Sequence, residues 1–384
     1  MEGPVCFRDV IPYGNLENGT LTLTKGFSLT VPFSGISECM LVSANVRFEG
    51  EALPTIQFSL WVDGQEEPLY LSHAYTFGKA DGFSMKEWRV PPMMQSDMSA
   101  RLEVVIPEGT TVFLRGMSAR YDAHFSEWKG GLRHNAHLGF YGIAPNNTMP
   151  SLELAAKCGF PACIVVPKVT KDGVLVCIHD DTINRTARDE DGNPPKENML
   201  VWEYTYEELR QWDYGFWQNE IYQGTKIPKL EEFFDLCART GMRPMFSTHP
   251  GLTVAQWQEV KEMLKKRGLL KMFHIKSFEA EVLATAYSVF GDEIDGYTRD
   301  SKNWSEQLIA DMKEAGIAQG NCRVGIELPF KKYTAEMAQK ILDAGMFASA
   351  WWVERTSAEE YRRLISYGVT EFTEDHHCSM GLNW

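Results

Sequence analysis

Apolar and polar residues alternate along the first third of the chain with the two-residue period of β-strands. In TIQFSLWV the side chains of Ile56, Phe58, Leu60 and Val62 fall on one face, and TLTLTKGFSLTVPF alternates in a similar way nearer the N-terminus. Gly and Pro separate the strand-like runs, and no helical period of useful length interrupts them. Short alternating strands at this spacing predict an antiparallel β-sandwich, jelly-roll-like, over residues 1–125.

From about residue 135, apolar strand-like runs alternate with amphipathic helical ones. The strand-like runs are AHLGF, ACIVVPKV, RPMFSTH, MFHIKS, IDGYTR, CRVGIELPF, FASAWWV and TEFTED. Helical segments such as LEEFFDLCARTG and TAEMAQKILDAG end in glycine, the residue that most easily adopts the left-handed conformation closing a helix. This alternation predicts an α/β fold, a (β/α)8 TIM barrel over residues 126–384, with the functional groups at the C-terminal ends of its strands.

Composition and charge narrow the class of partner. The chain has 384 residues, 44% of them hydrophobic, and a net charge of −14, which argues against nucleic acid or an anionic membrane as partner. No apolar run is long enough for a membrane span, and the N-terminal segment has no signal pattern, so we expect a cytoplasmic protein. A secreted protein whose signal had been removed would show the same pattern. The eight cysteines lack zinc-site spacing, and we expect them to be free thiols.

Most of the candidate chemistry lies between residues 137 and 186. This stretch reads HLGFYGIAPNNTMPSLELAAKCGFPACIVVPKVTKDGVLVCIHDDTINRT, and its first and last histidines are His137 and His179. Histidine titrates near neutral pH, and two histidines near one cavity are suited to general acid–base catalysis. The alternative is that both histidines are hydrogen-bonded elements of the barrel core.

Together with DYGFW…GTKIPKLEEFF, IKSFEAEVL and AWWVE…YGVTEFTED, this stretch resembles the glycerophosphodiester phosphodiesterase family over nearly all of residues 135–378. The resemblance implies a TIM-barrel phosphoric diester hydrolase of lipid metabolism, with His137 and His179 as general acid and base. The N-terminal sandwich lies outside the resemblance. It is a candidate carbohydrate-binding or interaction module.

The resemblance fails at the metal ligands. In the family, three strand carboxylates hold a divalent cation against the phosphate. The family's Glu-x-Asp falls on Ile164 and Val166 of this chain, and its Glu-x-Lys falls on Ser247 and His249. A hard cation needs oxygen ligands, and isoleucine and valine offer none. We therefore expect that the divalent metal of the family is lost and that no other cofactor replaces it.

Other residues at the ends of the predicted strands are candidates for substrate binding. Strand alternation predicts that Ile164, Val166 and Lys168 share the inward face, where the Lys168 ammonium would supply the counter-charge of the lost cation. Asn146 replaces the glutamate of the family's Pro-Glu-Asn-Thr, and Trp351 falls on a tryptophan of its seventh strand. The candidates are Lys168, His249, Asn146, Ser247, Lys276, Glu327 and Trp351. Each of them also has an ordinary structural reading, as a packed or solvated side chain.

These residues predict the character of the cavity. With the carboxylates gone, His137, His179, Lys168 and His249 would make it neutral to positive, which suits a small polar or anionic ligand. Lys276 and Arg299 follow the fourth and fifth predicted strands and would add positive charge.

Three functions stay open at this point. The first is a metal-independent hydrolase that acts on a phosphodiester or a sugar-containing substrate. The second is a pseudoenzyme that binds a ligand without turnover. The third is a carbohydrate-active enzyme, which would need two carboxylates, such as Glu327 with Glu374 or Asp375. The residues do not decide the oligomeric state, and a homo-oligomer is one alternative.

Overall fold

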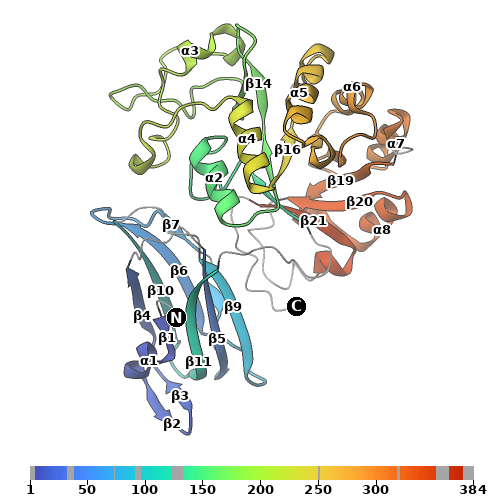
Figure 1. The fold of residues 1–384 in the computed structure, drawn as a ribbon. Coiled ribbons are helices and arrows are strands. Elements are labelled where there is room, and N and C mark those ends of the chain that lie inside the picture. Colours follow the sequence, from blue (N-terminus) through green and yellow to red (C-terminus); the bar gives the residue numbers. More distant parts are fainter. Residues whose placement is uncertain are drawn as a thin grey trace. The chain divides into compact units, whose positions relative to one another are not determined.

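The computed structural model describes residues 5–32, 39–72, 74–90, 97–122, 133–249, 251–317, 321–351 and 363–374. The chain forms two compact units, one from the elements between residues 5 and 122 and one from those between residues 133 and 374 (Figure 1). In the described part of the chain, no helix is both long and apolar enough to cross a membrane.

Two antiparallel sheets make up the first unit. Its elements are β1 (Val5–Cys6), α1 (Phe7–Val10), the 3-10 helix η1 (Ile11–Tyr13), β2 (Asn15–Glu17), β3 (Thr20–Leu23), β4 (Phe27–Pro32), β5 (Cys39–Glu49), β6 (Thr55–Val62), β7 (Tyr70–Leu71), β8 (Tyr75–Thr76), β9 (Ser84–Val90), β10 (Met98–Val105) and β11 (Thr111–Asp122). One sheet has the order β2-β3-β11-β5-β9 and the other β4-β10-β6-β7. Strands from the two ends of the unit lie side by side, as in a double Greek key, which confirms the predicted jelly-roll-like sandwich.

The core of this unit lies between the two sheets. Phe58 on β6 and Trp88 on β9 belong to different sheets, and their ring centroids are 6.0 Å apart. The predicted inward face of β6 is buried, since Ile56, Phe58, Leu60 and Val62 are at most 5% exposed. Strand alternation alone therefore identified the residues that hold the sheets together.

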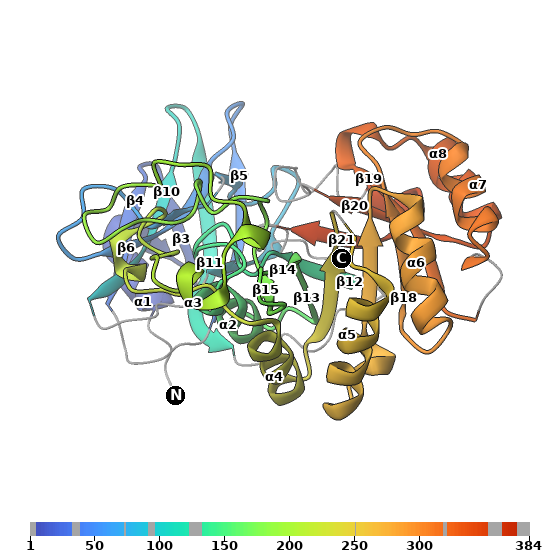
Figure 2. The same ribbon diagram turned by 90° about the horizontal axis from the view of Figure 1, so that it is seen from above.

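Eight parallel strands close into the barrel of the second unit, which confirms the predicted TIM-barrel fold (Figures 1 and 2). The strands are β12 (Arg133–His137), β13 (Ala162–Val165), β16 (Arg243–Ser247), β17 (His274–Ser277), β18 (Gly296–Asp300), β19 (Arg323–Pro329), β20 (Phe347–Trp351) and β21 (Val369–Glu374). The helices outside them are α2 (Met149–Lys157), α4 (Leu230–Thr240), α5 (Val254–Lys266), α6 (Ala280–Phe290), α7 (Gln307–Glu314) and α8 (Ala335–Asp343), with short 3-10 turns η4 (Leu270–Met272) and η6 (Phe330–Lys332).

Local sequence signals set the ends of these helices. The Thr253 and Thr334 side chains each accept a hydrogen bond from a backbone N–H in the first turn of the helix that follows. Helix α4 ends at Gly241, with φ of 74°, and Gly345 follows α8 with φ of 75°. The glycines that predicted helix ends therefore occupy the left-handed positions that terminate them.

Two strands of the barrel are shorter than their apolar runs. Strand β12 ends at His137, because Leu138 and Gly139 turn the chain with φ of 58° and 88°. Strand β13 ends at Val165, and the next residue donates its N–H to the Asn147 side chain at 3.0 Å. Pro167, which has no N–H, then begins another strand outside the barrel.

That strand belongs to an excursion between β13 and α4. It contains a hairpin of β14 (Pro167–Val169) and β15 (Leu175–Cys177), followed by η2 (Val201–Glu203), α3 (Tyr206–Leu209) and η3 (Glu220–Tyr222). A cluster of buried side chains that includes Val176, Ile178, Ile183, Val201 and Leu209 packs inside it. This packing fixes the residues that follow β15, among them His179.

The N-terminal end of the barrel is closed by buried charges. Arg243 donates to Asp295 at 2.8 Å and to Glu371 at 3.2 Å, and His274 contacts Asp295 at 2.9 Å. Burial raises the pKa of Glu371, but Arg243, His274 and Arg323 outweigh it and lower the pKa to about 2. The mutual satisfaction of these charges stabilises the barrel at the end away from the strand tips.

Candidate functional site

A cavity of about 780 Å³ lies at the C-terminal ends of the barrel strands. It is lined by His137, Val166, His179, Asp180, Asp181, Ser247, His249, Lys276, Phe278, Asp300, Lys302, Trp351 and Thr373. The candidates His137, His179, Ser247, His249, Lys276 and Trp351 are therefore brought together at one cavity. Asn146, Lys168 and Glu327 are not among the residues that line it.

His179 is held by an acidic side chain and an arginine. Its Nδ1 lies 2.7 Å from Asp180 Oδ1, and Arg185 donates to the same carboxylate at 2.5 and 3.0 Å. Burial raises the pKa of Asp180, but the hydrogen bonds from His179 and Arg185 outweigh it, so that pKa lies well below its usual range. An ionised Asp180 favours the proton on Nδ1, which leaves Nε2 of His179 free to exchange a proton with a ligand.

His137 is positioned by a tight turn at the end of the first barrel strand. The Leu138 carbonyl accepts hydrogen bonds from the Asn147 N–H at 2.9 Å and from the Ser151 hydroxyl at 3.2 Å. A positive φ is unfavourable for leucine, and such strain is typical of functional sites. Gly139 is required here, because an added Cβ would lie 2.2 Å from Ser151 Oγ.

The loop that follows supports this turn. Asn147 also has a positive φ, 53°, and its side-chain oxygen accepts the N–H of Val166. The preceding Asn146 is 6% exposed, and its Nδ2 has no hydrogen-bond partner among the described residues. The two amides therefore lie behind the cavity wall, and the proposed contact of Asn146 with substrate stays a prediction.

Two of the three positions that hold metal-ligand carboxylates in the family are apolar, and the third is Ser247. Ile164 is fully buried against Ala162 and Met245 inside the barrel, and Val166 lines the cavity at 5% exposure. Within the described ranges, no group of three or more His, Cys, Asp or Glu side chains could hold a metal ion. The residues present at these positions do not fit a hard divalent cation, which needs oxygen ligands.

Lys168 does not lie where strand alternation placed it. It belongs to β14, outside the barrel, and its ammonium donates to Asp181 Oδ1 at 2.6 Å and to the His249 carbonyl at 3.0 Å. The prediction that it follows Ile164 and Val166 along one strand is wrong, because β13 ends at Val165. Lys168 braces two residues of the cavity wall from behind.

A buried charged cluster lies on the wall formed by β17, β18 and β19. The Lys276 ammonium donates to Glu327 and lies 3.4 Å from Asp300. Glu327 also accepts from the hydroxyls of Ser349 and Thr373, both at 2.7 Å. Glu327 is 1% exposed and therefore reaches the cavity through the side chains that it binds, the Lys276 ammonium and the Thr373 hydroxyl.

The three groups of this cluster shift one another's pKa values. Burial lowers the pKa of Lys276, but the neighbouring carboxylates outweigh it and raise that pKa. Burial raises the pKa of Asp300 and, although Lys276 opposes this, the charge of Glu327 adds to it, so the pKa of Asp300 lies well above its usual range. Burial also raises the pKa of Glu327, but Lys276 and Asp300 outweigh it and lower that pKa. The two carboxyls are therefore shifted in opposite directions, with the negative charge favoured on Glu327 and the proton favoured on Asp300.

Ion pairs neutralise most of the cations at the cavity. His249 Nδ1 lies 2.8 Å from Glu279, and Lys168, Lys276 and Arg185 each pair with a carboxylate. The expectation of a field dominated by His137, His179, Lys168 and His249 therefore needs correction, because Asp180, Asp181 and Glu279 face three of these four groups. Lys302 has no ion-pair partner among the described residues.

An aromatic corner completes the wall. The rings of Phe278 and Trp351 meet edge to face, with centroids 6.3 Å apart. Trp351 therefore lines the cavity, as its place in the family pattern predicted, while Trp352 lies outside the described residues. Such a corner offers an apolar surface to the carbon skeleton of a ligand.

Sequence reasoning missed Asp300 and favoured its neighbour Arg299. Alternation along β18 turns Asp300 inward, whereas Arg299 donates to Asp311 of α7 at 3.3 Å. The sequence held a signal for Asp300, because this residue is the last of its strand. Which face of the sheet its side chain occupies, however, depends on the register of the strand. On β21, Thr373 lines the cavity and Glu374 is buried against His134, while Asp375 lies outside the described residues.

The fold and this cavity define a TIM-barrel protein with a cavity at the C-terminal ends of its barrel strands. Residues 137–377 match the model of the glycerophosphoryl diester phosphodiesterase family, and the chain belongs to this family. Membership brings the chain into a class of phosphodiester hydrolases.

Several relatives support this assignment. A glycerophosphodiester phosphodiesterase of Caldanaerobacter subterraneus is 26% identical over 247 residues, 62% of this chain and 92% of that protein. The putative glycerophosphodiester phosphodiesterase YhdW of Bacillus subtilis is 36% identical over 96 residues, which span 25% of this chain and 36% of that protein.

Solved structures share the barrel. A phosphodiesterase of Oleispira antarctica, in complex with the product sn-glycerol-3-phosphate, superposes with a TM-score of 0.53 at 23% identity, covering 64% of this chain and 93% of that one. A putative glycerophosphoryl diester phosphodiesterase of Silicibacter pomeroyi gives 0.55 at 22% identity, over 66% and 95%. At this identity the likeness shows the fold alone.

Proposed function

We propose that this protein hydrolyses a small phosphodiester, with His137 and His179 as the acid–base pair and without a divalent cation. The observation that carries the proposal is the contrast within one cavity. His179 keeps an ionised aspartate and an arginine that orient it, while Ile164, Val166 and Ser247 replace the three metal-ligand carboxylates of the family. The reaction class is that of the family, and the absence of the metal is the part specific to this chain.

The reaction needs one proton acceptor and one proton donor. One histidine takes a proton from the attacking water molecule as the water oxygen bonds to phosphorus. The other gives a proton to the leaving alcohol as its bond to phosphorus breaks. Positioned acid–base groups contribute about 10²- to 10⁴-fold each, whereas a Lewis acid contributes several kcal/mol of charge stabilisation. The ammonium of Lys276 is the buried cation that would oppose the charge of the phosphoryl oxygens in its place.

The test is turnover of bis(4-nitrophenyl) phosphate by the full chain, with and without excess EDTA. We expect the rate to persist in EDTA and to fall by about 10²-fold or more in His179→Ala. A matched control is Lys313→Met, an exposed residue of α7 that does not line the cavity. Loss of turnover in EDTA that added Ca²⁺ or Mg²⁺ restores would contradict the metal-free part of the proposal.

A ligand-binding pseudoenzyme is the second candidate. The apolar wall and the paired cations favour it, because they bind a ligand without supplying a strong electrophile. It predicts ligand binding without product, unchanged by His179→Ala. The carbohydrate-active alternative is disfavoured, because Glu327 and Glu374 are at most 1% exposed and neither lines the cavity, while Asp375 lies outside the described residues. The carboxylates of a glycosidase stand roughly 5 Å or more apart, on either side of the sugar.

A further inference from the structure

A second cavity, of about 430 Å³, adjoins the first and shares Lys302 and Trp351 with it. Its other walls are Asn303, in the loop after β18, and residues 329–332, at the end of β19 and in η6. All of these segments leave the C-terminal ends of neighbouring barrel strands. We call this cavity the side pocket.

Three lysines line the side pocket. Lys302, Lys331 and Lys332 line it, are exposed, and have no ion-pair partner among the described residues. This differs from the main cavity, where Lys276 and His249 face carboxylates. Three ammonium groups in one concave site attract an anion, even in a chain whose net charge is −14.

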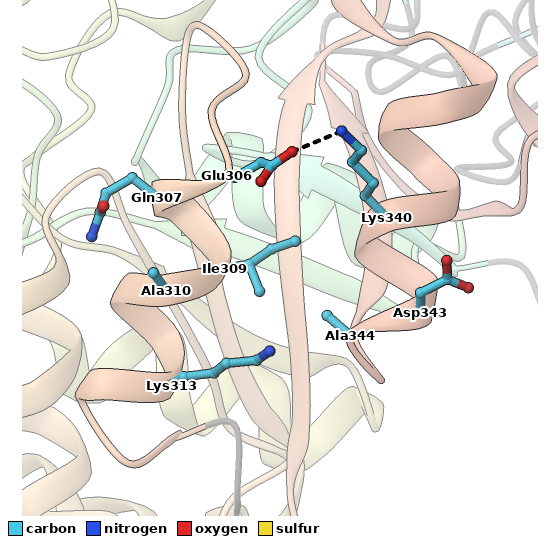
Figure 3. A pocket seen from close by; sticks show the side chains of 8 residues that line it. All are labelled: Glu306, Gln307, Ile309, Ala310, Lys313, Lys340, Asp343 and Ala344. Atoms are coloured by element: carbon cyan, nitrogen blue, oxygen red, sulfur yellow. Dashed lines mark hydrogen bonds and ion pairs between the residues drawn. The ribbon is translucent and has the colours of Figure 1, made fainter.

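In a groove elsewhere on the barrel unit, a lysine is paired with glutamates. Between α7 and α8, Lys340 lies 2.7 Å from Glu306, so charges of both signs meet there (Figure 3). Lys340 also lies 3.1 Å from Glu336. Lys313 lines the same groove. The concentration of one sign of charge therefore distinguishes the side pocket from a groove of similar size on the outer helices.

Two of these lysines, Lys331 and Lys332, belong to a segment whose neighbouring residues are buried and hydrogen-bonded. Phe330 and Tyr333 flank them and are each 2% exposed. The Tyr333 hydroxyl lies 2.6 Å from the Ser349 carbonyl and 3.2 Å from the Ile326 carbonyl, which ties the segment to β19 and β20. The backbone that carries Lys331 and Lys332 is thus held in place, so binding an anion does not require the segment to order first.

We propose that the side pocket binds a phosphate group carried by the alcohol part of the substrate, so that the substrate is a phosphodiester with a second, terminal phosphate. Lysine binds phosphate as a point charge, and three ammonium groups match a phosphate dianion better than a single carboxylate. The shared wall at Lys302 and Trp351 lets one ligand reach both cavities. This inference rests on the proposed function for the main cavity, and it adds the substrate class.

The test is a calorimetric titration in which inorganic phosphate is added to the full chain and the heat of binding is measured. We expect binding at millimolar concentrations, weakened about tenfold or more in the Lys331→Met/Lys332→Met variant and weakened by added salt. Lys313→Met removes one exposed charge from the outer groove and is expected to leave the affinity unchanged. Absence of binding to the native protein, or equal affinity in the double variant, would overturn the proposal.

One more variant separates this inference from the proposed function. His179→Ala is expected to lose turnover of bis(4-nitrophenyl) phosphate while it keeps the phosphate affinity of the native protein. Full turnover in His179→Ala would refute the catalytic proposal and leave the side pocket standing as an anion site. Loss of phosphate affinity in that variant would place the anion in the main cavity and refute the side pocket.

Discussion

Replacement of Lys276 by methionine tests the charged cluster of the barrel most directly. Lys276, Asp300 and Glu327 are each at most 4% exposed, and the lysine is the ion-pair partner of both carboxyls. Methionine keeps the length of the side chain and removes the charge. Glu327 must then either stay ionised without a cation or take up a proton.

The free-energy cost of the substitution is worked out for the second case, in which Glu327 takes up a proton, because this costs less than keeping a buried carboxylate without a cation. Holding a glutamate neutral at pH 7, when its unfolded pKa is about 4.3, requires about 3.7 kcal/mol, at 1.36 kcal/mol for each pH unit. At pH 5 the same step requires only about 1 kcal/mol. The larger figure agrees with the roughly 3–5 kcal/mol measured when one partner of a buried ion pair is removed, and it is a large part of an ordinary folding free energy.

The sign of the pH dependence is fixed by the same reasoning. In the native protein the pKa of Glu327 is lowered, so its stabilising contribution is present above the unfolded pKa. In Lys276→Met that pKa is raised, so stability is lost as the pH rises above the unfolded value. The difference in the free energy of unfolding between the two proteins should therefore widen between pH 5 and pH 7.

The assay is urea unfolding at both pH values. The unfolding is monitored by the helical signal in circular dichroism, to which the barrel unit contributes most. Lys313→Met controls for the loss of a charge at an exposed site. Lys276→Met/Glu327→Gln should recover part of the loss at pH 7, because no carboxylate is left without its cation. A difference that is the same at pH 5 and pH 7 would refute the reasoning.

Three further predictions concern the turn at His137, the support of His179 and the buried thiols. Gly139→Ala should lower the melting temperature more than Gly173→Ala, since both have φ above 80° but nothing lies within 4 Å of an added Cβ at Gly173; equal effects would show that the close contact relaxes. Asp180→Asn should lower kcat by about 10²-fold or more with little change in KM, because His179 loses its charged partner; unchanged steady-state kinetics would contradict the role. Burial raises the pKa of Cys163 to about 12, so this thiol should resist maleimide at pH 8 until urea unfolds the protein, and rapid labelling of the folded chain in mass spectra would count against its burial.

The candidate site was only partly accessible from the sequence. The His137 and His179 positions followed from the family pattern, and both line the cavity. The replacement of ligands by Ile164 and Val166 could also be read directly, because a single residue type decides whether oxygen is offered. Lys168 was misplaced, because its position depends on where β13 ends, and directly after that end the Val166 N–H donates to the Asn147 side chain, outside the strand ladder.

By itself the sequence determined the two architectures and brought His137 and His179 forward as candidates, and both line the cavity. Periodicity is a local property, and a face such as that of Phe58 and Leu60 is visible within eight residues. Only the tertiary structure decided the charge of the cavity, because barrel closure brings Lys276 to Glu327 from two separate strands. The tertiary structure likewise decided that Lys302 and Lys331, from two different loops, line the same side pocket. Charge is set by partners in space, and alternation along one strand does not reveal which partner the next strand will present.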